Sequence, residues 1–263
     1  SLYLSRRRSN PSRAHMAAVP RVMPINTAIH MTSRPSGLPS TAPLGRLRLM
    51  QLISPALPIG AFTSSQGLEW SVAEGWVRDV DTLEDWLEGL LSDGLAQLEL
   101  PILERLYGAC ELEEVNAIEH WGRKLYASRE TRELRVEECN RARALITLLA
   151  DLGIVKVADW KKSLRHCQAA PFALAAVHWQ ISVEDCLLGY AWGWLENQIA
   201  AAIKLVPLGQ TDGQRVQLQL AERLPVLVER ALAIGDDDIG AGAPALAIAS
   251  ARHETQYTRL FRS

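Results

Sequence analysis

The chain has 263 residues, of which 48% are hydrophobic and 22% are charged, as in folded globular proteins, so wholesale disorder is excluded. Residues 1–43 contain six arginines and no acidic residue, which leaves 22 basic against 30 acidic residues in the remainder, a net charge of −8. An acidic body argues against a nucleic-acid-binding protein. The sequence has no uninterrupted apolar run of 18 residues and therefore predicts no membrane-spanning helix.

Residues 1–43 are rich in Arg, Ser and Pro and show no apolar periodicity. Such a segment cannot bury enough apolar surface to offset its backbone entropy, so we expect a disordered leader. Organelle transit peptides share this composition. The simpler interpretation is an upstream extension, with translation starting near Met23 or Met31.

From Leu44 onward, apolar residues recur at helical spacing, and convincing alternating strands are missing. Asp81 is a suitable N-cap for a helix whose apolar stripe starts at Leu83. Pro101 is expected to begin the next helix. Charged helices are predicted over residues 111–128 and 130–152.

The C-terminal half continues the helical pattern. Ser182 is expected to cap a long apolar helix that Pro207 ends. Residues 216–232 predict a last amphipathic helix with a bend at Pro225. The loops are short, so the sequence predicts an all-α fold, a single compact multi-helix domain over residues 44–251.

No catalytic motif stands out. The chain has neither the G-x-x-x-x-G-K-[ST] phosphate loop nor the G-x-S-x-G nucleophile elbow. His253 begins an H-E-x-x-H pattern, but position 257 is Tyr, so the second zinc ligand is missing. His166 and Cys167 are adjacent but have no further ligands, and His178 is expected to be a hydrogen-bonded core histidine. We therefore expect no catalytic residue, no intrinsic metal site and no other cofactor.

The four cysteines are scattered and form no C-x-x-C pair. This spacing predicts buried thiols in a reducing compartment and argues against a disulfide framework or a zinc knuckle.

Two stretches do not resemble generic helix surface. Residues 54–70 contain two prolines and Gly60, which predict a rigid elbow before a short helix capped by Ser64 or Ser65. Lys204 ends the most apolar helix, close in sequence to several glutamines, and this composition predicts a hydrogen-bonding surface.

The last twelve residues, 252–263, place Tyr257, Leu260 and Phe261 at helical spacing among arginines. Tyr and Arg are enriched at interface hot spots. Ordering such a tail costs more free energy than burying three side chains returns, so we expect it to order fully only against a partner. The alternative is that the last helix packs on its own core.

Four stretches together resemble urease accessory protein F, the UreF family: SPALPIGAFTSSQGLEW (54–70), RETRELRVEE (129–138), KLVPLGQTDGQ (204–214) and LAIASARHETQYTRLFRS (246–263). The resemblance covers about residues 44–263 in family order. Residues 1–43 have no counterpart, and residues 138–143 depart from the glycine-containing pattern of the family.

The resemblance implies a cytoplasmic, all-helical, dimeric chaperone component of urease maturation that has no catalytic residues. Its implied partners are a UreD/UreH-type scaffold, a nickel-carrying UreG-type GTPase and the urease apoprotein, with nickel and GTP handled by the partners. No nucleic acid and no membrane is implied. The implied scaffold-binding residues lie in the tail, 252–263, and are Arg252, His253, Glu254, Gln256, Tyr257, Arg259, Leu260, Phe261 and Arg262. The GTPase-facing candidates are Gln66, Glu69, Lys204, Gln210 and Gln214.

Two further functions stay open. The chain could regulate GTP hydrolysis by the UreG-type GTPase, with Lys204 or Arg215 acting on phosphate charge in trans. It could also be an autonomous helical metal-binding enzyme, which would bind nickel and turn over without partners. An adaptor is the leading hypothesis.

Overall fold

The structure is a computed structural model, and it describes residues 40–60, 63–240 and 242–262. All the regular elements in these residues are helical, which confirms the predicted all-α class. In chain order they are α1 (Pro43–Leu52), α2 (Leu68–Ala73), α3 (Val80–Gly89), the π-helical segment η2 (Leu90–Glu99), α4 (Leu100–Glu111), α5 (Val115–Ala127), α6 (Arg132–Asp151), α7 (Lys156–Asp159), α8 (Lys161–Leu164), α9 (Ala169–His178), α10 (Val183–Leu205), α11 (Gln210–Ala221), α12 (Leu224–Ala233), the 3₁₀ turn η3 (Asp236–Asp238) and α13 (Pro244–His253).

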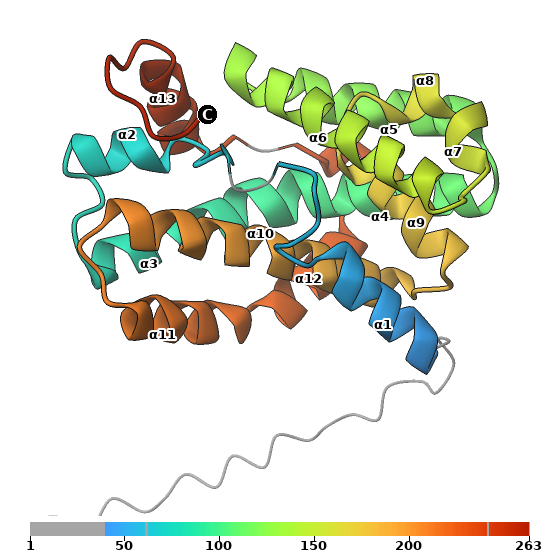
Figure 1. The fold of residues 1–263 in the computed structure, drawn as a ribbon, viewed down its shortest axis with the longest axis horizontal. Helices are drawn as coiled ribbons and strands as arrows, with labels where there is room; N and C mark the ends of the chain where they lie inside the picture. The colour runs from blue at the N-terminus through green and yellow to red at the C-terminus, as the bar shows by residue number, and fades with distance from the viewer. Residues whose placement is uncertain (1–39, 61–62, 241, 263) are drawn as a thin grey trace, which may run out of the picture. The chain divides into compact units, whose positions relative to one another are not determined.

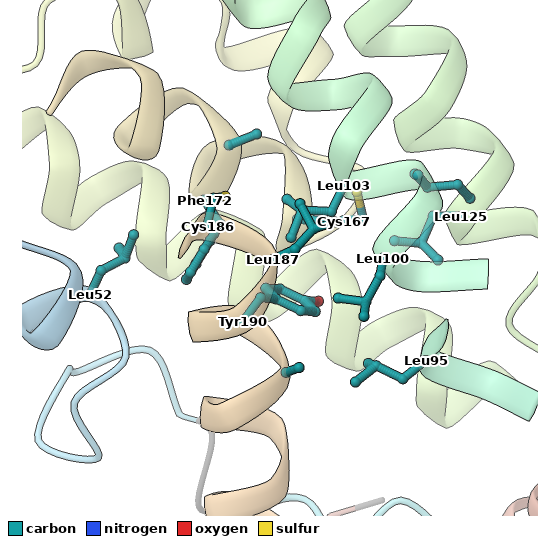
Figure 2. Packing of buried hydrophobic residues seen from close by; sticks show 14 of the residues in the cluster. Leu52, Leu95, Leu100, Leu103, Leu125, Cys167, Phe172, Cys186, Leu187 and Tyr190 are labelled. Carbon is teal, nitrogen blue, oxygen red and sulfur yellow. The ribbon is translucent and has the colours of Figure 1, made fainter. Parts of the chain in front are cut away.

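The core forms around α4, which packs against α5, α9, α10 and η2 (Figure 1). Leu100 and Leu103 of α4 are fully buried, and Figure 2 shows them beside Leu187 and Tyr190 of α10. Burying one such leucine contributes about 1.5–3 kcal/mol, so the buried leucines of α4 stabilise its packing on the surrounding helices.

The start of α3 differs from the prediction by two residues. Asp81 was expected to be the N-cap, but Asp79 holds that position, and its carboxylate accepts a hydrogen bond from Thr82 N at 2.9 Å. The Thr82 hydroxyl accepts in return from Asp79 N at 3.2 Å. A reciprocal capping box satisfies two helix-end donors, and it forms here with Thr82. The Asp81 cap prediction is therefore wrong.

Two other caps and one helix start can be compared with their predictions. The Ser182 side chain accepts from Asp185 N at the start of α10, as predicted. α4 begins at Leu100 with Pro101 in its first turn, also as predicted. α2 instead has Gly67 at its N-cap position, so the predicted position of the cap is wrong, but the Ser65 hydroxyl does accept from Glu69 N in the first turn of α2 at 3.3 Å.

The predicted helix over residues 216–232 is two helices. α11 ends at Ala221 and α12 begins at Leu224, with Pro225 in its first turn. Proline lacks the N–H that a continuous helix needs and clashes with the preceding turn, so the chain restarts a helix there instead of bending one.

His178 was expected in the core, but it lies exposed in the last turn of α9, so that prediction is wrong. Cys110, Cys167 and Cys186 are buried free thiols, as expected, and Cys139 is half-buried. Burial raises the pKa of the Cys110 thiol to about 12.

The predicted disordered leader falls mainly on residues 1–39, which lie outside the described residues. Thr41, which we had assigned to that leader, is buried, and its hydroxyl accepts from Ser182 N at 2.9 Å. Within the described part of the chain, no helix combines the length and the apolar character that crossing a membrane requires.

Candidate functional site

The chain end folds back onto the domain. α13 lies against α2, although the two are far apart in sequence (Figure 1). Residues 254–262, the C-terminal segment, continue without a further helix. The Arg262 N–H donates to the Thr63 carbonyl at 2.7 Å, and the Phe261 side chain is 7% exposed. The segment is therefore packed on its own domain in the isolated chain.

Glu69, in the first turn of α2, anchors this segment. Its side chain is buried, and its two carboxylate oxygens accept hydrogen bonds from the backbone N–H groups of Leu260 and Phe261, the latter at 2.9 Å. Hydrogen bonds to an ionised carboxylate are among the strong ones, each contributing about 1.5–3 kcal/mol. One side chain therefore fixes two consecutive peptide units of the chain end.

Gly67 allows α13 to approach α2 closely. Its φ of 81° lies in the left-handed region, and a Cβ there would lie 3.0 Å from the Ala249 Cβ. Any other residue would be strained at this φ and would push α13 away from the turn that places Glu69.

His253 joins the same cluster from the end of α13. Its side chain has no exposed surface; Nδ1 lies 2.7 Å from a Glu133 carboxylate oxygen, and Nε2 lies 3.2 Å from Glu69. Arg259 also bonds to Glu133. We call Glu69, Glu133, His253 and Arg259 the C-terminal latch, because together they connect α2, α6, α13 and the C-terminal segment.

The predicted scaffold-binding residues divide into two groups. His253 and Phe261 are buried, and Glu254 accepts from Glu133 N at 2.9 Å. Tyr257 and Leu260 lie on the outside, 103% and 65% exposed. The latch thus holds a segment whose exposed large hydrophobic side chains are a tyrosine and a leucine.

The remaining residues of that prediction lie at the periphery. Arg252 and Arg262 are exposed, and Arg259 reaches Glu133 from the surface. Gln256 is half-buried, and its Oε1 has no hydrogen-bond partner among the described residues. These polar groups flank Tyr257 and Leu260 in the sequence.

The GTPase-facing candidates also fall into two groups, one exposed and one buried. Lys204, Gln210 and Gln214 are exposed at the end of α10 and on α11. Lys204 Nζ lies 5.8 Å from the centre of the Phe261 ring, within the range of a cation–π contact. The structure thus joins two regions that the sequence presented separately, the Lys204 region and the chain end.

Gln66 and Glu69 lie in the interior instead. The Gln66 amide oxygen accepts from Trp194 Nε1 at 2.8 Å and from Gln198 Nε2 at 3.3 Å. Both residues are less than one tenth exposed. Their contacts are with this chain's own residues, so any influence on a partner passes through the backbone that they position.

A second charged cluster lies deeper, and the sequence analysis assigned it no role. Arg129 Nη1 lies 2.9 Å from Glu99, Arg129 Nε lies 2.8 Å from Glu138, and the Tyr190 hydroxyl donates to Glu99 at 3.3 Å. We call these four residues the interior cluster. The sequence did carry a signal for this cluster, because Arg129 and Glu138 lie within one of the stretches that resemble the family.

Burial alone lowers the pKa of the Arg129 guanidinium, but Glu99 and Glu138 outweigh it and raise that pKa well above its usual value. Burial, reinforced by the same carboxylates, raises the pKa of the Tyr190 phenol. Arg129 therefore stays charged and Tyr190 stays a hydrogen-bond donor, so the interior cluster joins η2, α6 and α10.

Comparison with known proteins identifies the family. The UreF family model matches residues 77–221. The urease accessory protein UreF of Alcanivorax borkumensis is 50% identical over 222 residues, covering 82% of this chain and 97% of the relative. That of Pseudomonas putida is 50% identical over 220 residues, covering 84% and 98%. The chain belongs to the UreF family.

The same relationship extends to Alkalilimnicola ehrlichii, whose urease accessory protein UreF is 46% identical over 220 residues, covering 84% of this chain and 96% of the relative. Membership in the UreF family confirms the resemblance drawn from the four sequence stretches. Among the described residues of this UreF-family chain, no group of three or more His, Cys, Asp or Glu side chains is arranged to hold a metal ion.

Proposed function

We propose that this chain acts in urease maturation as an adaptor that does no chemistry itself. It links a UreD/UreH-type scaffold to a UreG-type GTPase in the cytoplasm, as a dimer, so that nickel, the cargo, reaches the urease apoprotein. Its relatives' name, urease accessory protein, supports the coarse role. The division between adaptor, scaffold and GTPase rests on the family resemblance.

The observation that carries the scaffold side is the fixed chain end with its exposed side chains. A flexible tail would lose about 1–2 kcal/mol of backbone entropy per residue on binding. Here Glu69 already holds the Leu260 and Phe261 amides, while Tyr257 and Leu260 remain exposed. A pre-ordered tyrosine and leucine, with arginines at the rim, have the composition of an interface hot spot.

Partner capture tests this role. The Tyr257→Ala/Leu260→Ala double variant is expected to bind the scaffold at least about tenfold more weakly, because hot-spot truncations cost 2 kcal/mol or more. The matched control is Leu112→Ala/Val155→Ala, two side chains that are also exposed, at 70% and 76%. Equal capture of both variants by the purified scaffold would contradict the adaptor role of the segment.

The contacts of His253 make truncation of the tail an unsuitable test of scaffold binding. Removing residues 252–263 would delete His253 and leave Glu69 and Glu133 without it in a buried site. We therefore expect that truncation to destabilise the fold. The side-chain variants above leave the latch in place and separate binding from folding.

A second candidate function is regulation of GTP hydrolysis, and the position of Lys204 favours it. Lys204 is exposed, and no carboxylate in the described part of the chain forms an ion pair with it. A free cation could act on phosphate charge in trans. Single-turnover GTP hydrolysis in wild-type and Lys204→Ala complexes tests this idea, and unchanged rates would remove it.

The third hypothesis, an autonomous nickel enzyme, predicts stoichiometric nickel on the purified chain. Equilibrium dialysis at micromolar free nickel measures this directly. Because the adaptor handles nickel only as a partner's cargo, we expect no stoichiometric binding; one bound ion per chain, with turnover in the absence of partners, would contradict the proposal.

A further inference from the structure

A basic groove lies on the part of the domain formed by α5, α6 and α8, which pack against one another (Figure 1). Its volume is about 850 Å³, and five cationic side chains line it: Arg123, Arg143, Lys161, Lys162 and Arg165. Among the residues that the structure describes, no carboxylate lines it. None of these residues belongs to the C-terminal latch or to the Lys204 region.

These cations are largely uncompensated. Arg123 pairs with Glu119 on its own helix, and Arg143 lies 3.4 Å from the Asn140 side-chain oxygen. Among the described residues, no carboxylate forms an ion pair with Lys161, Lys162 or Arg165. Several like charges held together without counterions create a local positive potential that attracts an anionic group.

The side chain of His166 also lines the groove and lies in the same positive potential. Its Nε2 is buried and has no hydrogen-bond partner among the described residues. Burial, followed by Arg123 and Arg165, lowers its pKa. Glu119 opposes this shift, and burial together with the two arginines outweighs it.

The remainder of the lining is apolar. Tyr126, Ala127 and Ile146 line the groove, together with the half-buried Cys139. A phosphate ion would not need this apolar surface or this volume. A long nucleic acid or a membrane surface would be repelled by the acidic surface around the groove, since residues 44–263 carry a net −8 even with the five groove cations included. An apolar floor with a cationic rim fits a short peptide that carries both carboxylates and apolar side chains.

We infer that the groove between α5, α6 and α8 binds an acidic, partly apolar segment of a partner protein. Lys161, Lys162 and Arg165 bind its carboxylates, and Tyr126 and Ala127 contact its apolar side chains. This surface is additional to the exposed tyrosine and leucine of the C-terminal segment, and the inference stands whether or not the adaptor role is correct.

The test uses the full chain and a short fluorescein-labelled peptide of Glu-Glu-Leu repeats, with a Gln-Gln-Leu peptide as the uncharged match. Fluorescence anisotropy measures Kd. The variant Lys161→Glu/Lys162→Glu is expected to weaken binding about tenfold or more, because two attractive contacts become repulsive. The control Arg78→Glu/Arg215→Glu makes the same charge change at exposed sites outside the groove and is expected to change Kd less than about twofold.

Cys139 provides a readout at the site itself. Its half-buried thiol lines the groove, so bound peptide is expected to slow its modification by a maleimide. Circular dichroism of both double variants checks that they fold. Weaker binding in the groove variant alone, together with protection of Cys139, supports the inference.

Four results would overturn it: no saturable binding of the acidic peptide, equal binding of the Gln-Gln-Leu peptide, equal losses in the two double variants, or no protection of Cys139. Inorganic phosphate that displaces the peptide better than sodium chloride of equal ionic strength would show a phosphate site instead. Self-association that the groove variant abolishes, without peptide binding, would show that the occupant is a second copy of the chain.

Discussion

Two charged clusters in this molecule use the same chemistry for different purposes. In the interior cluster, one cation, Arg129, lies between two buried carboxylates, and all of its partners belong to helices or to the residues beside them. In the C-terminal latch, His253 lies between Glu69 and Glu133, and the Glu69 carboxylate also binds backbone amides of a chain end. The interior cluster holds only buried groups, whereas the latch holds a segment that carries the exposed side chain of Tyr257.

The difference lies in what each cluster holds. Arg129 is the cation between Glu99 and Glu138, so its loss leaves two buried carboxylates without a counterion and affects the whole domain. The carboxylates of the latch have partners other than His253: Glu133 also bonds to Arg259, and Glu69 also accepts hydrogen bonds from backbone amides. We therefore expect losses in the latch to be smaller and more local, and four measurements break or sharpen this contrast.

The largest effect is expected for Arg129→Met. It leaves Glu99 and Glu138 buried without their cation, which costs about 3–5 kcal/mol of unfolding free energy. Urea denaturation measures it. Adding Glu99→Gln and Glu138→Gln should recover much of the loss, because no uncompensated charge then remains.

The exposed Arg223–Glu88 pair is the matched control. Arg223→Ala is expected to cost less than about 1 kcal/mol, because surface ion pairs contribute little. If Arg129→Met costs no more than Arg223→Ala, the interior cluster does not hold the helices together.

His253→Ala is expected to cost about 2–3 kcal/mol, because the buried Glu69 and the half-buried Glu133 each lose a polar contact with the imidazole but keep others. Urea denaturation again measures the loss, and trypsin cleavage after Arg259 should become faster as the segment loosens. The exposed His178→Ala serves as the control and is expected to stay within about 0.5 kcal/mol of wild type. A global loss as large as that of Arg129→Met would erase the contrast between the clusters.

Phe261→Ala is expected to act locally. Removing this side chain loses about 1.5 kcal/mol, the lower end of the range for a buried Phe, and removes the ring under Lys204. Trypsin sensitivity at Arg259 and Arg262 should rise while the urea midpoint changes little. The control, Tyr257→Ala, should change neither, since its side chain is fully exposed. A large shift of the urea midpoint would make the chain end part of the core.

Much of the helical architecture could be predicted from local patterns. The Ser182 cap and the Pro101 start depend on residues next to the helix end, and both are confirmed. The π-helical segment Leu90–Glu99 was missed because its apolar residues satisfy α-helical spacing equally well. Asp79 was missed because Asp81 is a residue of the same type and lies closer to Leu83, where the apolar stripe starts, and the partner that selects Asp79 is Thr82.

Residues of the candidate site could be named from the sequence, but the contacts between them could not be predicted. His253 was tested against a zinc motif and set aside, yet its partners are Glu69 and Glu133, 184 and 120 residues away. No local spacing encodes such contacts. The thermodynamic argument about the tail was also incomplete, since it counted buried side chains but not the backbone hydrogen bonds that Glu69 accepts.

The central claim is that the latch orders the C-terminal segment before any partner binds. Amide hydrogen exchange of the isolated chain measures this at Leu260 and Phe261, whose N–H groups Glu69 binds. We predict protection of at least about tenfold over an unstructured peptide, reduced in Glu69→Gln, because a charge-assisted hydrogen bond must open before exchange. Exchange of both amides at the rate of an unstructured peptide in the wild-type chain would contradict the account.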